Sequence, residues 1–346
     1  MSLIADLPAA RPRPAAPTLA LLGLLALAFV AVPLAATPYV IEAILLPFLA
    51  LSLAGLGLNL LTGYGGQLSL GSAAFMAVGA FAAYNFQLRL ALPLLPSMVL
   101  AALTAAAIGV VFGLPSLRLR GFYLAVSTLA AQFFVQWALT KFSWFSNDSA
   151  SGVVAAPRLS LLGIDLDSPQ GRYLFALTVV AAITVLVHRI VRSREGVNLI
   201  AVRDDETAAK VIGVPVLRTK LAAFAISSAI IGVAGVIWAY AYLRTVEPAG
   251  FNLDRSFQVL FIIIIGGLTT IRGAFLGAAL IVVFPLLLAR AASFAFEGLI
   301  DAGVIKLVER VVLGVVIILF LIAEPNGLSA ILGRATARVR GWLGRG

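Results

Sequence analysis

The sequence contains no cysteine and one histidine, His188. The absence of thiols excludes disulfide bonds, cysteine-based metal sites and thiol nucleophiles. The sequence also lacks the Gly-x-x-x-x-Gly-Lys-[Ser/Thr] motif that cradles phosphates and the His-Glu-x-x-His pair that binds zinc. We therefore expect neither catalytic nor metal-ligating residues, no cofactor held by this chain, and no enzymatic activity of its own.

Charged residues are also scarce. They make up 12% of the chain against 62% hydrophobic residues, and the mean hydropathy is +1.07. Soluble proteins carry roughly 25% charged residues, so this composition excludes a water-soluble fold. The sequence predicts an all-α, polytopic membrane protein.

Apolar runs free of Asp, Glu, Lys and Arg recur along the whole chain. A membrane-spanning helix needs about 20 such residues, and we expect about ten transmembrane helices. The runs lie near 19–36, 43–61, 70–88, 92–114, 121–140, 173–187, 221–243, 256–271, 273–289 and 311–323.

The distribution of charge predicts the orientation. With both termini in the cytoplasm, the inner segments carry the whole net charge of +10 and the outer segments carry none, as the positive-inside rule requires. We expect a disordered cytoplasmic tail at 1–18, a transmembrane domain at 19–323 and a basic cytoplasmic tail at 324–346. The first apolar run also begins as a signal peptide does, but its length favours a retained helix.

We expect no ionisable residue within the spans, and therefore none of the Asp, Glu or His relays of pumps and proton-coupled carriers. If the chain moves a solute uphill, the energy therefore comes from another subunit.

A cluster of glycines interrupts the helical pattern at Gly63, Gly65, Gly66 and Gly71. Irregular backbone at membrane depth persists only where protein or a water-filled cavity satisfies its polar groups, so we expect a substrate pathway here. Each small polar residue, taken alone, is equally compatible with close helix packing. The predicted pathway residues are Asn59, Gly65, Gly66, Gln67, Ser69, Ser127 and Thr128. A second pair, Gly266-Gly267, also precedes a run of small residues, which hints at related halves.

Two loops are long. The outer loop, 141–172, is rich in turn-forming residues and serves as a connector or a docking surface. The inner loop, 188–220, carries a high density of charge, and its stretch Glu195–Gly213 predicts one amphipathic helix that ends at Gly213 and Pro215.

Four ordered stretches within 45–290 resemble the LivM-type permeases of branched-chain amino acid ABC importers. They are Gly63-Tyr64-Gly65-Gly66-Gln67-Leu68-Ser69-Leu70-Gly71, Leu119-Arg120-Gly121-Phe122-Tyr123-Leu124-Ala125, Ala201-Val202-Arg203-Asp204-Asp205-Glu206 through Gly213, and Gly266-Gly267 with Arg272-Gly273. The resemblance implies alternating-access transport of branched-chain or related amino acids in a bacterial or archaeal plasma (inner) membrane.

The resemblance also implies partners. They are a second permease of the LivH type, two cytoplasmic ATPase subunits of the LivG/LivF type, which would bind the ATP, and an extracytoplasmic substrate-binding protein; no nucleic acid is expected. The third stretch would be the helix that docks into the ATPase. Its expected coupling residues are Arg203, Asp204, Asp205, Glu206, Ala208, Ala209 and Gly213.

The chain departs from the family pattern at three places. Thr207 stands between the acidic residue and the alanine pair, Ser72 replaces a histidine, and the outer glycine-rich motif is reduced to 147–152. The departures leave the substrate open, since related permeases carry urea or short amides. A secondary transporter or facilitator is the remaining alternative.

Overall fold

The computed structural model describes residues 27–296 except 120, 150 and 162, and also 311, 312, 314, 315, 318, 322 and 327–334. The chain divides into two units after Thr37. Of the first unit the structure describes π-helix η1 (Leu27–Ala31) and α2 (Val32–Ala35). All that follows concerns the second unit. The expected tail at 1–18 lies outside the described residues, and of the expected tail at 324–346 the structure describes 327–334.

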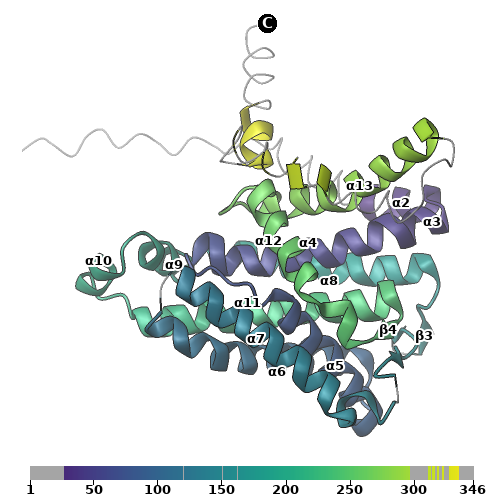
Figure 1. The fold of residues 1–346 in the computed structure, drawn as a ribbon, viewed down its shortest axis with the longest axis horizontal. Coiled ribbons are helices and arrows are strands. Elements are labelled where there is room, and N and C mark those ends of the chain that lie inside the picture. The colour runs from purple at the N-terminus through teal and green to yellow at the C-terminus, as the bar shows by residue number, and fades with distance from the viewer. Residues whose placement is uncertain are drawn as a thin grey trace, which may run out of the picture. The chain divides into compact units, whose positions relative to one another are not determined.

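Long helices form nearly all of the second unit (Figure 1). The first runs without a break from Pro38 to Tyr64. It consists of α3 (Pro38–Val40), η2 (Ile41–Leu45), α4 (Leu46–Asn59) and η3 (Leu60–Tyr64). The other long helices are α5 (Ser72–Leu90), α6 (Leu94–Gly113), α7 (Phe122–Lys141), α8 (Pro169–Arg192), α11 (Val216–Ile237) with its π-helical extension η6 (Trp238–Leu243), α12 (Leu253–Gly266) and α13 (Ile271–Phe296).

Short elements connect the long helices. They are the 3-10 turns η4 (Leu114–Leu117), η5 (Ser143–Ser146) and η7 (Pro248–Phe251), the helices α9 (Arg194–Asp204) and α10 (Glu206–Val211), and the strands β1 (Val154–Ala155), β2 (Ser160–Leu161), β3 (Ile164–Asp165) and β4 (Thr245–Val246). The outer loop contains the strands β1, β2 and β3. Its strand β1 pairs antiparallel with β4, and β2 pairs with β3.

Seven of the described helices are long and apolar enough to cross a membrane. They are Pro38–Tyr64, Leu94–Gly113, Phe122–Lys141, Pro169–Arg192, Val216–Leu243, Pro248–Gly266 and Ile271–Ala291. Each of them matches a predicted apolar run, and α5 matches another but is less apolar because it contains Asn85, Gln87 and Arg89. The first predicted run, 19–36, is described only from residue 27, and the last, 311–323, is described only in part. The structure thus confirms a multi-pass helical membrane protein and leaves the count of ten as a prediction.

The core of the bundle is the crossing of α5 and α11, where two backbones touch. A Cβ atom built on Gly79 would lie 2.1 Å from the carbonyl oxygen of Gly232, and one built on Gly235 would lie 1.9 Å from that of Met76. Only glycine fits at such distances. In lipid the hydrophobic effect does not drive helices together, and small residues instead let two helices pack closely.

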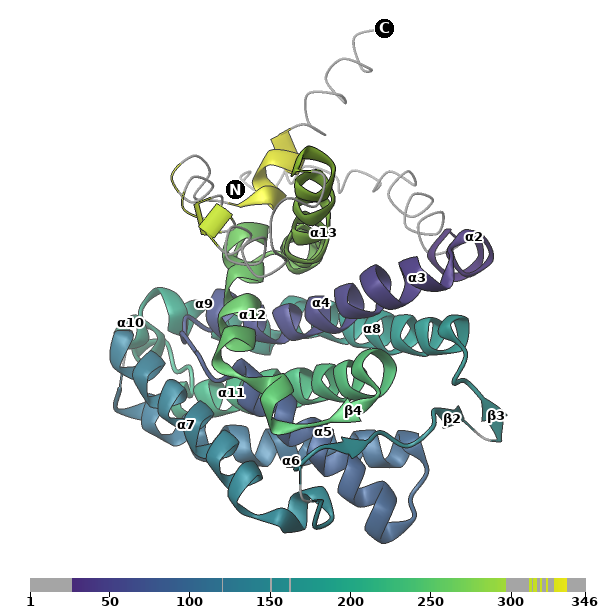
Figure 2. The same ribbon diagram turned by 45° about the vertical axis from the view of Figure 1, so that its right-hand side comes forward.

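The bundle has two ends with different character. Helices α9 and α10 lie at one end, which we call the α10 end, and strands β2, β3 and β4 lie at the other, the strand end (Figures 1 and 2). The helices α4, α8, α11 and α6 run side by side between them.

Two expectations from the sequence are wrong. The stretch Glu195–Gly213 is not one helix, because the backbone of Asp205 is extended (φ −157°, ψ 111°) and separates α9 from α10. The Asp205 carboxylate accepts hydrogen bonds from the amides of Thr207 (2.7 Å) and Ala208 (3.0 Å). Aspartate at such an N-cap competes with a continuous helix.

The second correction concerns charge within the spans. The helices extend beyond their apolar runs, and so the span Pro38–Tyr64 includes Glu42 and the span Pro169–Arg192 includes Arg172. These two residues form an ion pair, which removes the cost of an isolated charge.

Candidate functional site

The glycine-rich stretch after η3 forms the break that the sequence predicts. Helix η3 ends at Tyr64, and α5 does not begin until Ser72. Gly66 adopts a left-handed conformation (φ +66°), and its amide donates to the carbonyl of Thr62 at 3.1 Å. Glycine takes this conformation without steric cost, which explains why the helix ends here.

A cavity of about 340 Å³ lies between this break and the inner loop, at the α10 end. Its walls combine predicted pathway residues with predicted coupling residues. They are Gly65, Gly66, Gln67, Leu119, Gly121, Leu124, Val202, Arg203, Asp204, Asp205, Glu206, Thr207 and Lys220. The structure thus brings together two sets of residues that are separated by more than a hundred positions in the sequence.

Two contacts join the loop and the break directly, and an ion pair within the loop lines the same cavity. The Nη1 atom of Arg203 donates to the carbonyl oxygen of Gly63 at 3.1 Å. The Nζ atom of Lys220 forms an ion pair with Glu206, and both side chains are largely buried, at 6% and 16% exposure. The side-chain amide of Gln67 points to the backbone carbonyl of Lys220 at 3.5 Å.

The predicted coupling residues do not share one face. Ala209 is 1% exposed and packs against Val202 and Val216 inside the protein. The most exposed apolar side chains of the inner loop are Val211 and Ile212, which are 83% and 74% exposed. Ala208 and Gly213 are also exposed, and Gly213 has a φ of +87° as expected of a helix stop. The sequence predicts that Ala209 faces a partner, whereas in the structure its side chain lies inside the protein and those of Val211 and Ile212 are exposed.

A second polar cluster lies deeper in the bundle, where α5 begins. The Gln132 side chain on α7 accepts hydrogen bonds from the Ala74 amide (2.5 Å) and the Ser256 hydroxyl (3.1 Å). Its amide group donates to the Phe251 carbonyl at 2.9 Å. The Ser256 hydroxyl in turn accepts from the Ala73 amide at 2.9 Å. Side chains of α7 and α12 therefore satisfy the N-terminal amides of α5, whose N-cap residue is a glycine without a side chain.

Sequence reasoning missed Gln132 and Ser256 as site residues. Gln132 is wholly buried and Ser256 is 1% exposed. A glutamine inside an apolar run was the available signal, but Gln136 offers the same signal one turn further along and is not in this cluster. The distinction depends on which side of α7 faces α5.

The remaining predicted pathway residues differ in placement. The Thr128 hydroxyl accepts from the Leu70 amide at 2.9 Å, and the Ser69 hydroxyl accepts from the Gly71 amide at 3.3 Å, so both hold the break. Asn59 contacts the turn after α12 through the Thr270 carbonyl (2.9 Å) and the Thr269 amide (3.0 Å). The structure does not bring Ser127 into either cluster; its side chain is half-buried.

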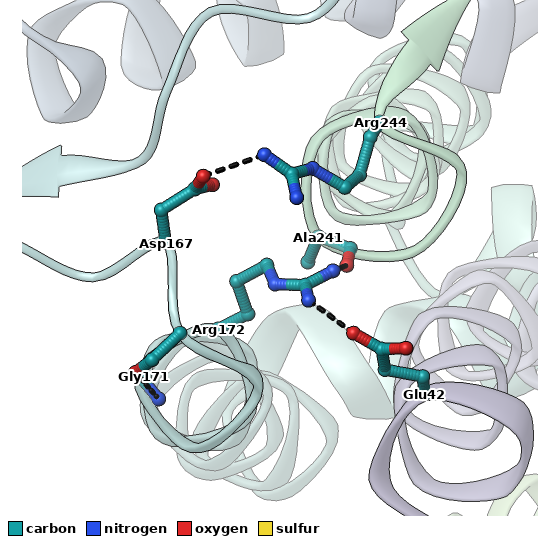
Figure 3. Close-up of polar contacts among 7 residues, drawn as sticks. Glu42, Asp167, Gly171, Arg172, Ala241 and Arg244 are labelled. Atoms are coloured by element: carbon teal, nitrogen blue, oxygen red, sulfur yellow. Dashed lines mark hydrogen bonds and ion pairs between the residues drawn. The ribbon is translucent and has the colours of Figure 1, made fainter. Parts of the chain in front are cut away.

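At the strand end, Arg172 fastens three segments together (Figure 3). Its guanidinium donates to the Ala241 carbonyl in η6 at 3.0 Å and pairs with Glu42 in η2. Nearby, Arg244 pairs with Asp167 at 2.5 Å. These contacts hold the span Val216–Leu243 in place where it reaches the strand end of the bundle.

The comparisons with known proteins agree with this architecture. The family model described as the permease component of the branched-chain amino acid transport system matches residues 40–321. The chain belongs to this family.

Curated relatives carry corresponding names. The high-affinity branched-chain amino acid transport system permease proteins LivM of Salmonella typhimurium and Escherichia coli are each 32% identical over 252 residues, covering 66% of this chain and 59% of theirs. A probable branched-chain amino acid transport permease protein LivM of Methanocaldococcus jannaschii is 23% identical over 245 residues, covering 68% of each chain. The chain thus spans about three fifths of the length of the first two relatives. No solved structure matches.

The matched region contains every residue of the two clusters. The break at Gly63–Gly71, the loop with α9 and α10 and the Gln132 cluster all lie within residues 40–321 of the family match. Both clusters therefore belong to the part of the chain that it shares with other members of this family.

Proposed function

We propose that this family member is the membrane-spanning permease subunit of an ATP-driven ABC importer for branched-chain amino acids. It would act by alternating access in the plasma (inner) membrane of a bacterium or archaeon, and it would perform no chemistry on the solute. Its partners would be a second permease, two cytoplasmic ATPase subunits and an extracytoplasmic substrate-binding protein.

One observation supports this proposal most directly: the same cavity is walled by the glycine break and by the loop that ends in exposed apolar residues. Two isolated apolar side chains at the tip of a charged loop, Val211 and Ile212, have a natural role as anchors in the groove of a partner. The break provides irregular backbone of the kind that lines a pathway. A partner that moves the loop would thereby act on the pathway.

The topology follows from the same assignment. The α10 end would be cytoplasmic, as the charge distribution predicts, and the strand end would receive substrate from the binding protein. The solute selectivity would come from the pathway between Gln132 and the break.

The test is reconstitution of the chain with its proposed partners in liposomes. Uptake of leucine, isoleucine and valine should require ATP inside and the binding protein outside. Replacing both Val211 and Ile212 with aspartate should reduce co-purification of the ATPases at least about tenfold, since loss of buried anchors typically costs more than about 1.4 kcal/mol.

The matched control is Val197→Asp. Val197 is also exposed, at 64%, but it lies in α9 rather than at the α10 tip. This variant should retain the ATPases. Leucine transport by the isolated chain without ATP would instead establish a facilitator, and competition by urea or short amides but not by leucine would change the substrate class.

A further inference from the structure

The inner loop forms a rigid part of the helical bundle where its side chains face inward. Val202 of α9, Ala209 of α10 and Val216 of α11 pack into one apolar cluster. The Val214 amide donates to the Ala209 carbonyl at 2.9 Å, which closes the turn between α10 and α11. A force on α10 is therefore passed to α9 and to the start of α11.

Arg203 connects this rigid loop to the break. Besides its hydrogen bond to the Gly63 carbonyl, its side chain lies directly against Gly66. A Cβ atom on Gly66 would lie 2.6 Å from the Arg203 Cγ atom. The glycine and the arginine thus fit each other, and the arginine faces the break rather than a docking partner.

The pair formed by Glu206 and Lys220 is the second connection. Glu206 is the first residue of α10, and Lys220 lies in the first turns of α11. Because both side chains are largely buried, loss of either partner leaves an uncompensated charge in a low-dielectric region. The backbone carbonyl of Lys220 faces the Gln67 side chain, so the ion pair holds in place the turn of α11 that contacts the break.

We propose that Arg203 with Gly63, and Glu206 with Lys220, form an inner latch that transmits movement of the loop to the break. The latch residues position the pathway; they do not dock the partner. This inference rests on the proposed function for its purpose, but the latch itself is a property of this chain and is testable without any partner.

The first experiment exploits the absence of cysteine. In the full chain in lipid nanodiscs, Ser69→Cys reports on the break, because Ser69 is 1% exposed and follows Gln67 closely. Its rate of labelling by a small maleimide should rise about tenfold in Arg203→Gln and in Lys220→Met, the change expected from loss of one charge-assisted hydrogen bond or ion pair.

Matched variants distinguish an effect of the latch from a general loosening of the fold. Arg194→Gln in the same helix α9 and Lys210→Met in α10 remove exposed cations and should leave the labelling rate unchanged. A second reporter, Ser97→Cys in α6, is equally buried and should label slowly in every variant. Exchanging the charges, with Glu206→Lys and Lys220→Glu together, should restore slow labelling of Ser69→Cys.

The reconstituted importer supplies a second readout. With Arg203→Gln, the ATPases should still bind and still hydrolyse ATP. The uptake of solute per ATP should fall about tenfold, because one charge-assisted hydrogen bond is lost. Unchanged labelling of Ser69→Cys in both latch variants would overturn the latch whatever the partners prove to be. If labelling rises but no ATPase binds the native chain, the latch stands and the proposed function fails.

Discussion

Replacing Gln132 with leucine should destabilise the protein strongly, because one buried side chain serves three partners. It bonds the Ala74 amide, the Ser256 hydroxyl and the Phe251 carbonyl. Side-chain hydrogen bonds in membrane proteins contribute about 0.6–1.7 kcal/mol each, so three of them amount to about 2–5 kcal/mol. Leucine has a similar volume and restores none of the three.

Gln136→Leu is the matched control on the same helix. Its side chain is half-buried and lies outside the Gln132 cluster. We expect a change in the free energy of unfolding of less than about 0.5 kcal/mol, as for surface substitutions.

The assay is reversible unfolding in mixed micelles by a denaturing detergent, followed by tryptophan fluorescence. Gln132→Leu should shift the midpoint far below that of the native chain, and Gln136→Leu should not. Equal midpoints for the two variants would refute the reasoning, since they would show that the N-terminal amides of α5 do not depend on Gln132. In the reconstituted importer, Gln132→Leu should also reduce uptake, because it destabilises the first turn of α5.

Two further predictions concern topology and packing. Single cysteines at Ser149 and Lys210, which lie in the outer loop and in α10, should label from opposite sides of sealed vesicles; labelling of both from one side would contradict the orientation. Gly235→Ala places a Cβ atom 1.9 Å from the Met76 carbonyl oxygen, and overpacking should lower the free energy of unfolding by about 1–3 kcal/mol or more. Gly250→Ala, which meets only the Leu243 and Glu247 side chains at 3.3 Å or beyond, should be far milder when both are unfolded by detergent.

The sequence predicts the helical runs and the glycine break because both are local properties. An apolar run of span length has one stable form in lipid, and Gly63, Gly65 and Gly66 together cannot hold a regular helix. Helix ends are less predictable. The span that contains Glu42 extends past its apolar run because Arg172, 130 positions away, pairs with the carboxylate, and such a partner is not visible in a local pattern.

The division between α9 and α10 was missed for a related reason. Asp204 and Asp205 are adjacent and chemically identical, and only one of them can take the extended backbone of an N-cap. The structure gives that role to Asp205, while Asp204 pairs with Arg203. Arg203 is in turn held at Gly63, a contact between distant segments that a local pattern does not show.

The two glycine pairs show how distant contacts complete what the sequence only suggests. Gly65-Gly66 and Gly266-Gly267 each end a helix, with φ values of +66° at Gly66 and +110° at Gly267. The Asn59 side chain, one turn before the first break, bonds both the Thr269 amide and the Thr270 carbonyl in the turn after the second.

A Cβ atom on Gly63 would lie 2.8 Å from the Thr269 amide nitrogen, so the two breaks approach each other closely. Arg203 holds the carbonyl of the same Gly63. A movement of the loop that displaces Gly63 must therefore disturb the turn after α12 as well, because no space separates them. The inner latch and Asn59 thus act on two segments of irregular backbone, 65–71 and 267–270, that lie in contact, and both glycine pairs would have to rearrange together when the pathway opens.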